Sequence, residues 1–136
     1  MRVLGIDPGT RFMGFGVVEE SRGQLTHIGH GVIRTDPSQA LELRLRTLHS
    51  ELGRAVALFR PHAMAVEGVF TCRNARSALI LGHARGVALL AASQADLRVF
   101  EYAPARVKRS VGAGGAAAKD AVARMVKTFL KMESLE

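Results

Sequence analysis

Two acidic residues, Asp7 and Glu67, stand where short apolar runs of the sequence end. Asp7 closes the run Val3–Asp7 and is followed at once by Pro-Gly, and Glu67 closes the run Ala63–Glu67. A single carboxylate in such a place is commonly a polar turn residue or a solvated strand end. Two of them at the ends of adjacent central strands can converge, and like charges that close need a cation. Because hard oxygen ligands favour Mg²⁺ or Mn²⁺, the pair is a candidate centre for metal-assisted phosphodiester hydrolysis.

The segment that follows Asp7 carries two glycines, Gly14 and Gly16, inside a predicted strand. Glycine within a strand leaves open space where a larger side chain would otherwise fill in. We therefore expect room beside Asp7 for an ion or a substrate.

The apolar pattern predicts five strands and three helices that position these residues. The predicted strands are Val3–Asp7, Phe12–Val18, Gln24–Arg34, Ala63–Glu67 and Val99–Tyr102, and the helices run from Pro37-Ser38 to Pro61, over Ser77–Ser93 and over Lys119–Lys131. Three consecutive strands followed by strand–helix–strand units predict an α/β fold, a mixed five-stranded sheet with helices on both faces. A chain of 136 residues predicts a single domain over residues 1–136.

Composition and charge narrow the class of partner. Lys and Arg number 19 against 12 Asp and Glu, for a net charge of +7, which suits a polyanion such as nucleic acid but does not by itself select one. Cys72 is the only cysteine, and the five histidines show no metal-ligand spacing. No apolar stretch approaches the ~18 residues that span a bilayer. We expect a cytoplasmic protein with no membrane partner.

Several longer motifs in the sequence resemble those of the RuvC family of Holliday-junction resolvases. They are LGIDPGT at 4–10, GFGVV at 14–18, VEGVF at 66–70, NARSALILGHARGVA at 74–88 and FEYAPARVK at 100–108. The resemblance implies an RNase H-like fold and a homodimer that binds four-way junction DNA. It further implies symmetric nicking of two opposed strands with two Mg²⁺ (or Mn²⁺) ions per subunit, beside a branch-migration helicase complex.

The same resemblance assigns roles to individual residues. Asp7 and Glu67 match the family's catalytic, metal-binding carboxylates. Phe70 matches an aromatic residue that contacts unstacked bases, although a core position is the alternative. The predicted DNA-binding residues are Phe70, Arg76, Lys108 and Lys119. The two lysines match basic residues of the family, and Arg76 would extend their basic surface; a solvated side chain is the commoner state of any one lysine.

The sequence also departs from the family. RuvC proteins complete the metal site with two further acidic residues, three apart, in an Ala-rich and Asp-rich helix. We expect this chain to lack that last acidic helix. Glu133 and Glu136 are three residues apart, as the family's two acidic residues are, but they follow the predicted helix Lys119–Lys131 with no intervening loop. We therefore expect them to form a frayed acidic tail rather than to replace the missing ligands. One alternative is therefore a catalytically inactive relative that binds branched DNA. A distant alternative is an actin-like ATPase lobe, because GIDPGT also resembles a phosphate loop, although such proteins need two lobes.

Gly82 and Gly86 lie inside the predicted helix Ser77–Ser93. Interior helix glycines cost ~1 kcal/mol each relative to alanine, so close packing is expected to require them. The packing partner is either the sheet or a two-fold mate.

Overall fold

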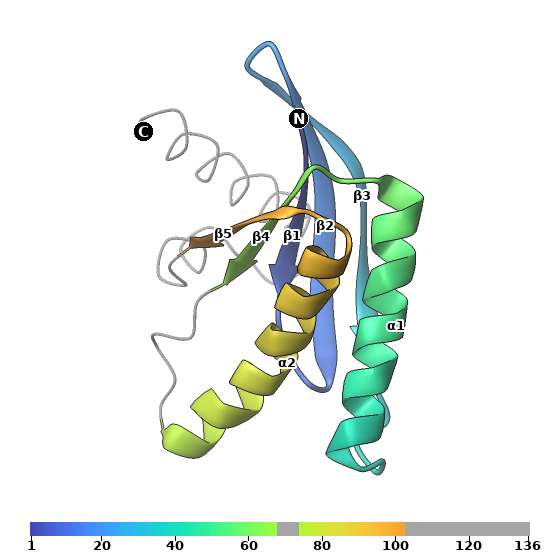
Figure 1. Cartoon of the computed structure of the whole chain (residues 1–136), viewed down its shortest axis with the longest axis vertical. Coiled ribbons are helices and arrows are strands. Elements are labelled where there is room, and N and C mark those ends of the chain that lie inside the picture. Colours follow the sequence, from blue (N-terminus) through green and yellow to red (C-terminus); the bar gives the residue numbers. More distant parts are fainter. Residues whose placement is uncertain (68–73, 103–136) are drawn as a thin grey trace.

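The computed structural model describes residues 1–67 and 74–102, which form a five-stranded sheet and two helices (Figure 1). The elements are β1 (Arg2–Asp7), β2 (Phe12–Ser21), β3 (Gln24–Arg34), α1 (Leu41–Phe59), β4 (Ala63–Glu67), α2 (Ala75–Gln94) and β5 (Arg98–Tyr102). All five strands and two of the three helices expected from the sequence are present. The third expected helix, 119–131, lies outside the described residues.

The sheet is mixed, with the strand order β3-β2-β1-β4-β5. β1 pairs antiparallel with β2, and β2 with β3, whereas β1 with β4 and β4 with β5 are parallel. Each parallel pair needs a helical crossover, and α1 and α2 provide them. β1 and β4 are neighbours in the interior of the sheet: β2 and β3 lie beyond β1, and β5 lies beyond β4. The two strand ends that carry the candidate carboxylates are therefore central.

A large apolar core lies between the sheet and the two helices. Both helices lie side by side on the same face of the sheet in Figure 1. The sheet contributes Leu4, Ile6 and Met64 to this core, and α1 contributes Leu48 and Leu52, all fully buried. Because every second residue of a strand points to the same face, this core fixes which face each strand residue occupies.

A smaller core forms on the opposite face of the sheet. Its buried members are Val3, Val18, Ala63 and Ala65, and Phe100 packs against them. These residues alternate along their strands with those of the larger core. Both faces of the sheet thus bury apolar side chains. The two described helices lie on one face (Figure 1), and the third expected helix, 119–131, falls outside the described residues.

The structure corrects the expected start of α1. The helix begins at Leu41 rather than at Pro37-Ser38. The Asp36 carboxylate accepts hydrogen bonds from the Ser38 hydroxyl (2.7 Å) and the Ser38 N–H (2.9 Å), and this local turn competes with the helix. Both bonds, the hydroxyl first, lower the pKa of Asp36.

The structure excludes the sheet as the packing partner of Gly82 and Gly86, which was one of the two alternatives left open by the sequence. Both residues are exposed, and a Cβ built at either position would meet no atom within 4 Å among the residues the structure describes. The alanines of α2, among them Ala84 and Ala88, make the sheet contact instead. The alternative of a two-fold mate stays a prediction.

Arg2 links three elements at the end of the sheet that lies away from Asp7. The Arg2 guanidinium donates to the Phe59 carbonyl oxygen (2.6 Å) and to the Glu19 carboxylate (3.0 Å), which joins β1 to β2 and to the end of α1. The hydrogen bond and the charge of Arg2 lower the pKa of Glu19. A lowered pKa means that folding favours the ionised carboxylate. The contact with Arg2 therefore stabilises the fold at pH values above the usual pKa of the Glu19 carboxyl.

Candidate metal and DNA site

Asp7 and Glu67 end two neighbouring parallel strands at the same edge of the sheet. The pairing of β1 with β4 runs up to Ile6 opposite Val66, and Asp7 and Glu67 are the next residue of each strand. Neighbouring strands lie ~4.8 Å apart. The register therefore brings the two acidic residues to adjacent positions, as two ligands of one ion would require.

The two side chains also share a face. On β1, Ile6 belongs to the core beneath the helices, so Asp7 points to the opposite face. On β4, Val66 belongs to that same core, so Glu67 points away from the helices as well. Asp7 is exposed and Glu67 half-buried. An opposed orientation, which would have separated the carboxylates by the thickness of the sheet, is thereby excluded.

Open space adjoins Asp7 on the side of β2. Gly14 lies directly opposite Asp7 in the β1–β2 register. Among the described residues, a Cβ built at Gly14 would meet only the Asp7 Cβ, at 3.8 Å. Any longer side chain at this position would extend over the face that the carboxylates share, so glycine keeps the space beside Asp7 unfilled.

The donor set suits a hard divalent cation. Two carboxylates on one face, held by strands paired on both sides, supply the oxygen ligands that Mg²⁺ and Mn²⁺ accept while keeping several waters. Among residues 1–67 and 74–102, no group of three or more His, Cys, Asp and Glu side chains is arranged to hold a metal. The described part of the site is therefore a pair of carboxylates.

The other residues predicted to bind DNA are only partly placed. Arg76 is exposed in the first turn of α2. The helix begins there because the Asn74 side chain accepts a hydrogen bond from the Ser77 N–H (2.8 Å) and so caps it. Phe70, Lys108 and Lys119 lie outside the described residues, so their roles stay predictions.

The sequence analysis overlooked a second cluster at this edge of the sheet. Phe12, the first residue of β2, is 49% exposed and carries the guanidinium groups of Arg11 and Arg34 at 5.6 and 5.2 Å from its ring centroid. Arg11 adjoins Phe12 in the chain, but Arg34 is 22 residues away. Only the pairing of β2 with β3, which places Arg34 opposite Phe12, brings the three together.

Comparison with known proteins defines the class. The model of one protein family, crossover junction endodeoxyribonuclease RuvC, matches residues 3–135. The sheet order, the two parallel crossovers and the helical layer are those of an RNase H-like domain, the fold of RuvC. The chain belongs to the RuvC family.

Individual relatives agree with this membership. The chain is 71% identical to a crossover junction endodeoxyribonuclease RuvC of Myxococcus xanthus over 98% of its own length and 70% of that protein. It is 45% identical to the RuvC of Geobacter sulfurreducens, over 99% of this chain and 82% of the relative. A solved structure of Thermus thermophilus RuvC in complex with a Holliday junction substrate superposes with a TM-score of 0.82, at 27% identity, over 98% of this chain and 96% of the other.

Proposed function

We propose that this chain resolves four-way DNA junctions by metal-dependent phosphodiester hydrolysis at Asp7 and Glu67. Membership of the RuvC family supplies the class, an endodeoxyribonuclease of crossover junctions. The observation that carries the assignment to these two residues is geometric. They end adjacent parallel strands, point to the same face, and adjoin the space left by Gly14.

Asp7 and Glu67 would hold the metal, two Mg²⁺ or Mn²⁺ ions per subunit by the family expectation. A bound ion of this kind polarises the phosphate, lowers the pKa of a water and neutralises the leaving oxygen. The chain's own contribution is placement. β1 is hydrogen-bonded to β2 and β4 on its two sides, so the backbone at Asp7 is fixed before any ligand arrives, and only the side chain has to be ordered on binding.

DNA affinity would come from the basic surface around this edge. The net charge of +7 favours binding to the phosphate backbone. Arg76 would contact phosphate from the start of α2, as would Lys108 and Lys119, and Phe70 would stack on an unpaired base, worth ~1–3 kcal/mol. These four assignments follow from the sequence, and the exposure of Arg76 is consistent with its role.

A homodimer matches the symmetry of the proposed substrate. Two equivalent cuts on opposed strands of a junction need two active sites related by a two-fold axis. The unfilled surface at Gly82 and Gly86 on α2 leaves room for a second helix to approach closely. A branch-migration helicase complex as a partner follows from the family expectation.

Cytoplasmic location is part of the same proposal. Neither of the two helices in the described residues has the length and apolar character to span a bilayer.

A cleavage assay on a synthetic four-way junction tests the proposal. With Mg²⁺ or Mn²⁺, the chain should nick two opposed strands, and Asp7→Asn or Glu67→Gln should slow nicking by at least roughly 10³-fold. Loss of a metal's several kcal/mol of transition-state stabilisation gives that scale, at 1.36 kcal/mol per tenfold. Junction binding should persist in both variants, because affinity depends on phosphate contacts.

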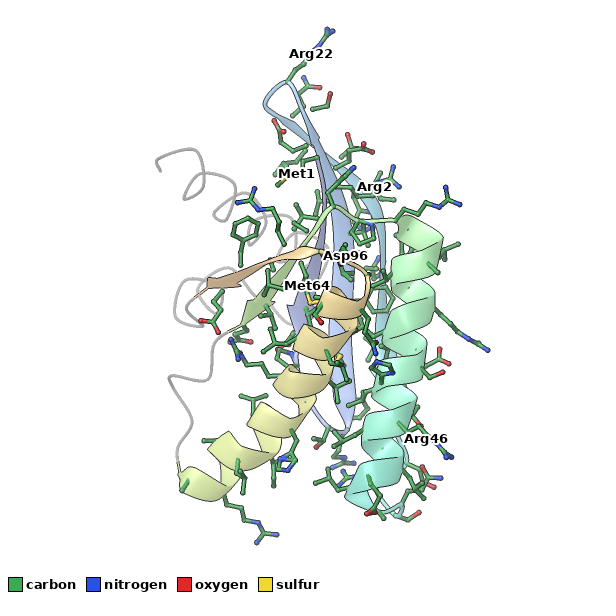
Figure 2. All side chains as sticks on the ribbon, in the orientation of Figure 1. Met1, Arg2, Arg22, Arg46, Met64 and Asp96 are labelled. Carbon is green, nitrogen blue, oxygen red and sulfur yellow. The ribbon has the colours of Figure 1, made fainter. Side chains whose placement is uncertain are left out.

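Asp96→Asn is the matched control for this assay. Asp96 is an exposed aspartate in the turn between α2 and β5 (Figure 2), and asparagine tolerates its positive φ of 58°. The control should cut as the parent chain does. An Asp7→Asn protein that still cuts refutes the assignment, and a parent chain that binds junctions without nicking at any metal concentration is a junction-binding relative rather than a nuclease.

A further inference from the structure

The cluster of Arg11, Phe12 and Arg34 is built into the fold rather than formed by loose surface side chains. The Thr35 N–H donates to the Arg11 carbonyl oxygen at 3.0 Å, and the Thr35 hydroxyl donates to the Thr10 carbonyl oxygen. These bonds tie the turn after Asp7 to the end of β3. The backbone on both sides of the Phe12 ring is thus fixed.

The turn itself tolerates little change. A Cβ built at Gly9 would overlap the carbonyl oxygen of Phe12, so the chain can pass this close to β2 only with glycine there. Thr10 is buried beneath the turn. Arg11 therefore leaves the turn from a defined position, next to the ring it contacts.

Neither Arg11 nor Arg34 has an acidic partner in the part of the chain that the structure describes. The ion pairs within residues 1–67 and 74–102 are Arg2–Glu19, Arg54–Glu51 and Arg85–Glu101, and none involves Arg11 or Arg34. Contact with an exposed aromatic face contributes ~0.5–1 kcal/mol per cation, while the two like charges on one ring repel each other. An anion bound between the guanidinium groups would remove that repulsion and complete their hydrogen bonding.

The cluster lies on the same face and edge as the carboxylate pair. Phe12 and Gly14 are two residues apart on β2, so they share a face, and Gly14 is the cross-strand partner of Asp7. Phe12 is thus the diagonal neighbour of Asp7, at ~7–8 Å. Because successive phosphates of a B-form strand advance only ~3.4 Å along the axis, a strand that crosses the carboxylate pair would bring a nearby phosphate within reach of the cluster.

We propose that Arg11 and Arg34, held on the Phe12 ring, form a phosphate clamp for the DNA strand that crosses the Asp7–Glu67 site. The clamp would bind the sugar-phosphate backbone on the β2–β3 side of the phosphate to be cut. It reads no base and acts by charge, so it contributes affinity and register rather than sequence preference. The inference rests on the proposed function, since it places the same DNA strand.

Salt-dependent binding of a synthetic four-way junction in EDTA tests the clamp without cleavage. Each phosphate contact contributes about 0.9 to the slope of log K against log salt. Arg11→Gln combined with Arg34→Gln removes two contacts per subunit. It should reduce the slope by about 1.8 for each subunit bound to the junction, and weaken binding at 0.1 M salt by roughly 8-fold per contact. Phe12→Leu keeps both charges and should weaken binding roughly 2- to 5-fold without a change in slope.

Arg22→Gln is the matched control, because it removes one positive charge at the tip of the β2–β3 hairpin, at the other end of the sheet (Figure 2). It should leave the slope unchanged. The single variants Arg11→Gln and Arg34→Gln, measured beside it, each remove one charge as Arg22→Gln does. The clamp is overturned if the double variant binds with the parent's affinity and slope, or if Arg22→Gln weakens junction binding as much as Arg11→Gln or Arg34→Gln alone. If the parent chain does not bind the junction at all, the proposed function fails and the clamp fails with it.

Discussion

Stability measurements on Asp7→Asn and Glu67→Gln report directly on whether the two carboxylates interact. The strands that carry them are ~4.8 Å apart, and both side chains point away from the helices. Two unit charges ~5 Å apart repel by about 0.8 kcal/mol in a water-like dielectric, the appropriate choice because Asp7 is exposed. Without metal, each single substitution should relieve this repulsion.

A double-mutant cycle isolates the pair term. In EDTA, urea unfolding of the parent, both single variants and the double variant should give a coupling of about 0.8 kcal/mol, repulsive in sign. With Mn²⁺ at about 100 times its dissociation constant, the parent should gain about 2.7 kcal/mol. Both single variants should gain much less, because each has lost a ligand.

Asp96→Asn is again the control, and it should respond to Mn²⁺ as the parent does. Zero coupling in EDTA, together with an Asp7→Asn protein that Mn²⁺ stabilises as much as the parent, would show that the two carboxylates neither repel each other nor share an ion. The carboxylates would then be independent surface groups, whatever their register.

Three further predictions concern the core, an ion pair and the space beside the site. Leu52→Ala should lower the free energy of unfolding by about 2–5 kcal/mol in urea, because Leu52 is fully buried, whereas Leu58→Ala, at 74% exposure, should change it by less than about 0.5 kcal/mol. Glu19→Gln should lower the melting temperature at pH 7, and its effect should shrink as the pH is lowered below 4.5. The lowered pKa of Glu19 gives stability that is present above its usual value of 4.5 and is lost as the pH falls through the folded value. Gly14→Ala should retain metal-dependent cutting, since its Cβ would lie at an ordinary 3.8 Å from the Asp7 Cβ, whereas Gly14→Leu should fill the space beside Asp7 and slow cutting.

The sequence predicted most elements of the fold because each has a strong local signal. Alternation and short apolar runs marked the five strands, and helical spacing of leucines marked α1. The predicted start of α1 was wrong because the Asp36 carboxylate accepts hydrogen bonds from Ser38. These bonds hold Ser38 in a turn before the helix begins. The sequence left the packing partner of Gly82 and Gly86 open between the sheet and a two-fold mate, because no local signal distinguishes open space from close packing.

The sequence was enough to predict the carboxylate pair but not the cluster of Arg11, Phe12 and Arg34, for a physical reason. Asp7 and Glu67 each end an apolar run, so each position is visible in its own short segment. The cluster around Phe12 depends on which residue of β3 lies opposite it. A shift of one residue in that pairing would move Arg34 to the other face of the sheet, and no local pattern sets that register.

Anomalous diffraction from crystals of the chain grown with Mn²⁺ would locate the metal relative to Asp7 and Glu67. We expect an anomalous peak on the sheet face that the two residues share, within roughly 2.0–2.6 Å of an oxygen of each carboxylate, and loss of that peak in Asp7→Asn crystals. Crystals in which no Mn²⁺ ion contacts both carboxylates would rule out the shared metal site.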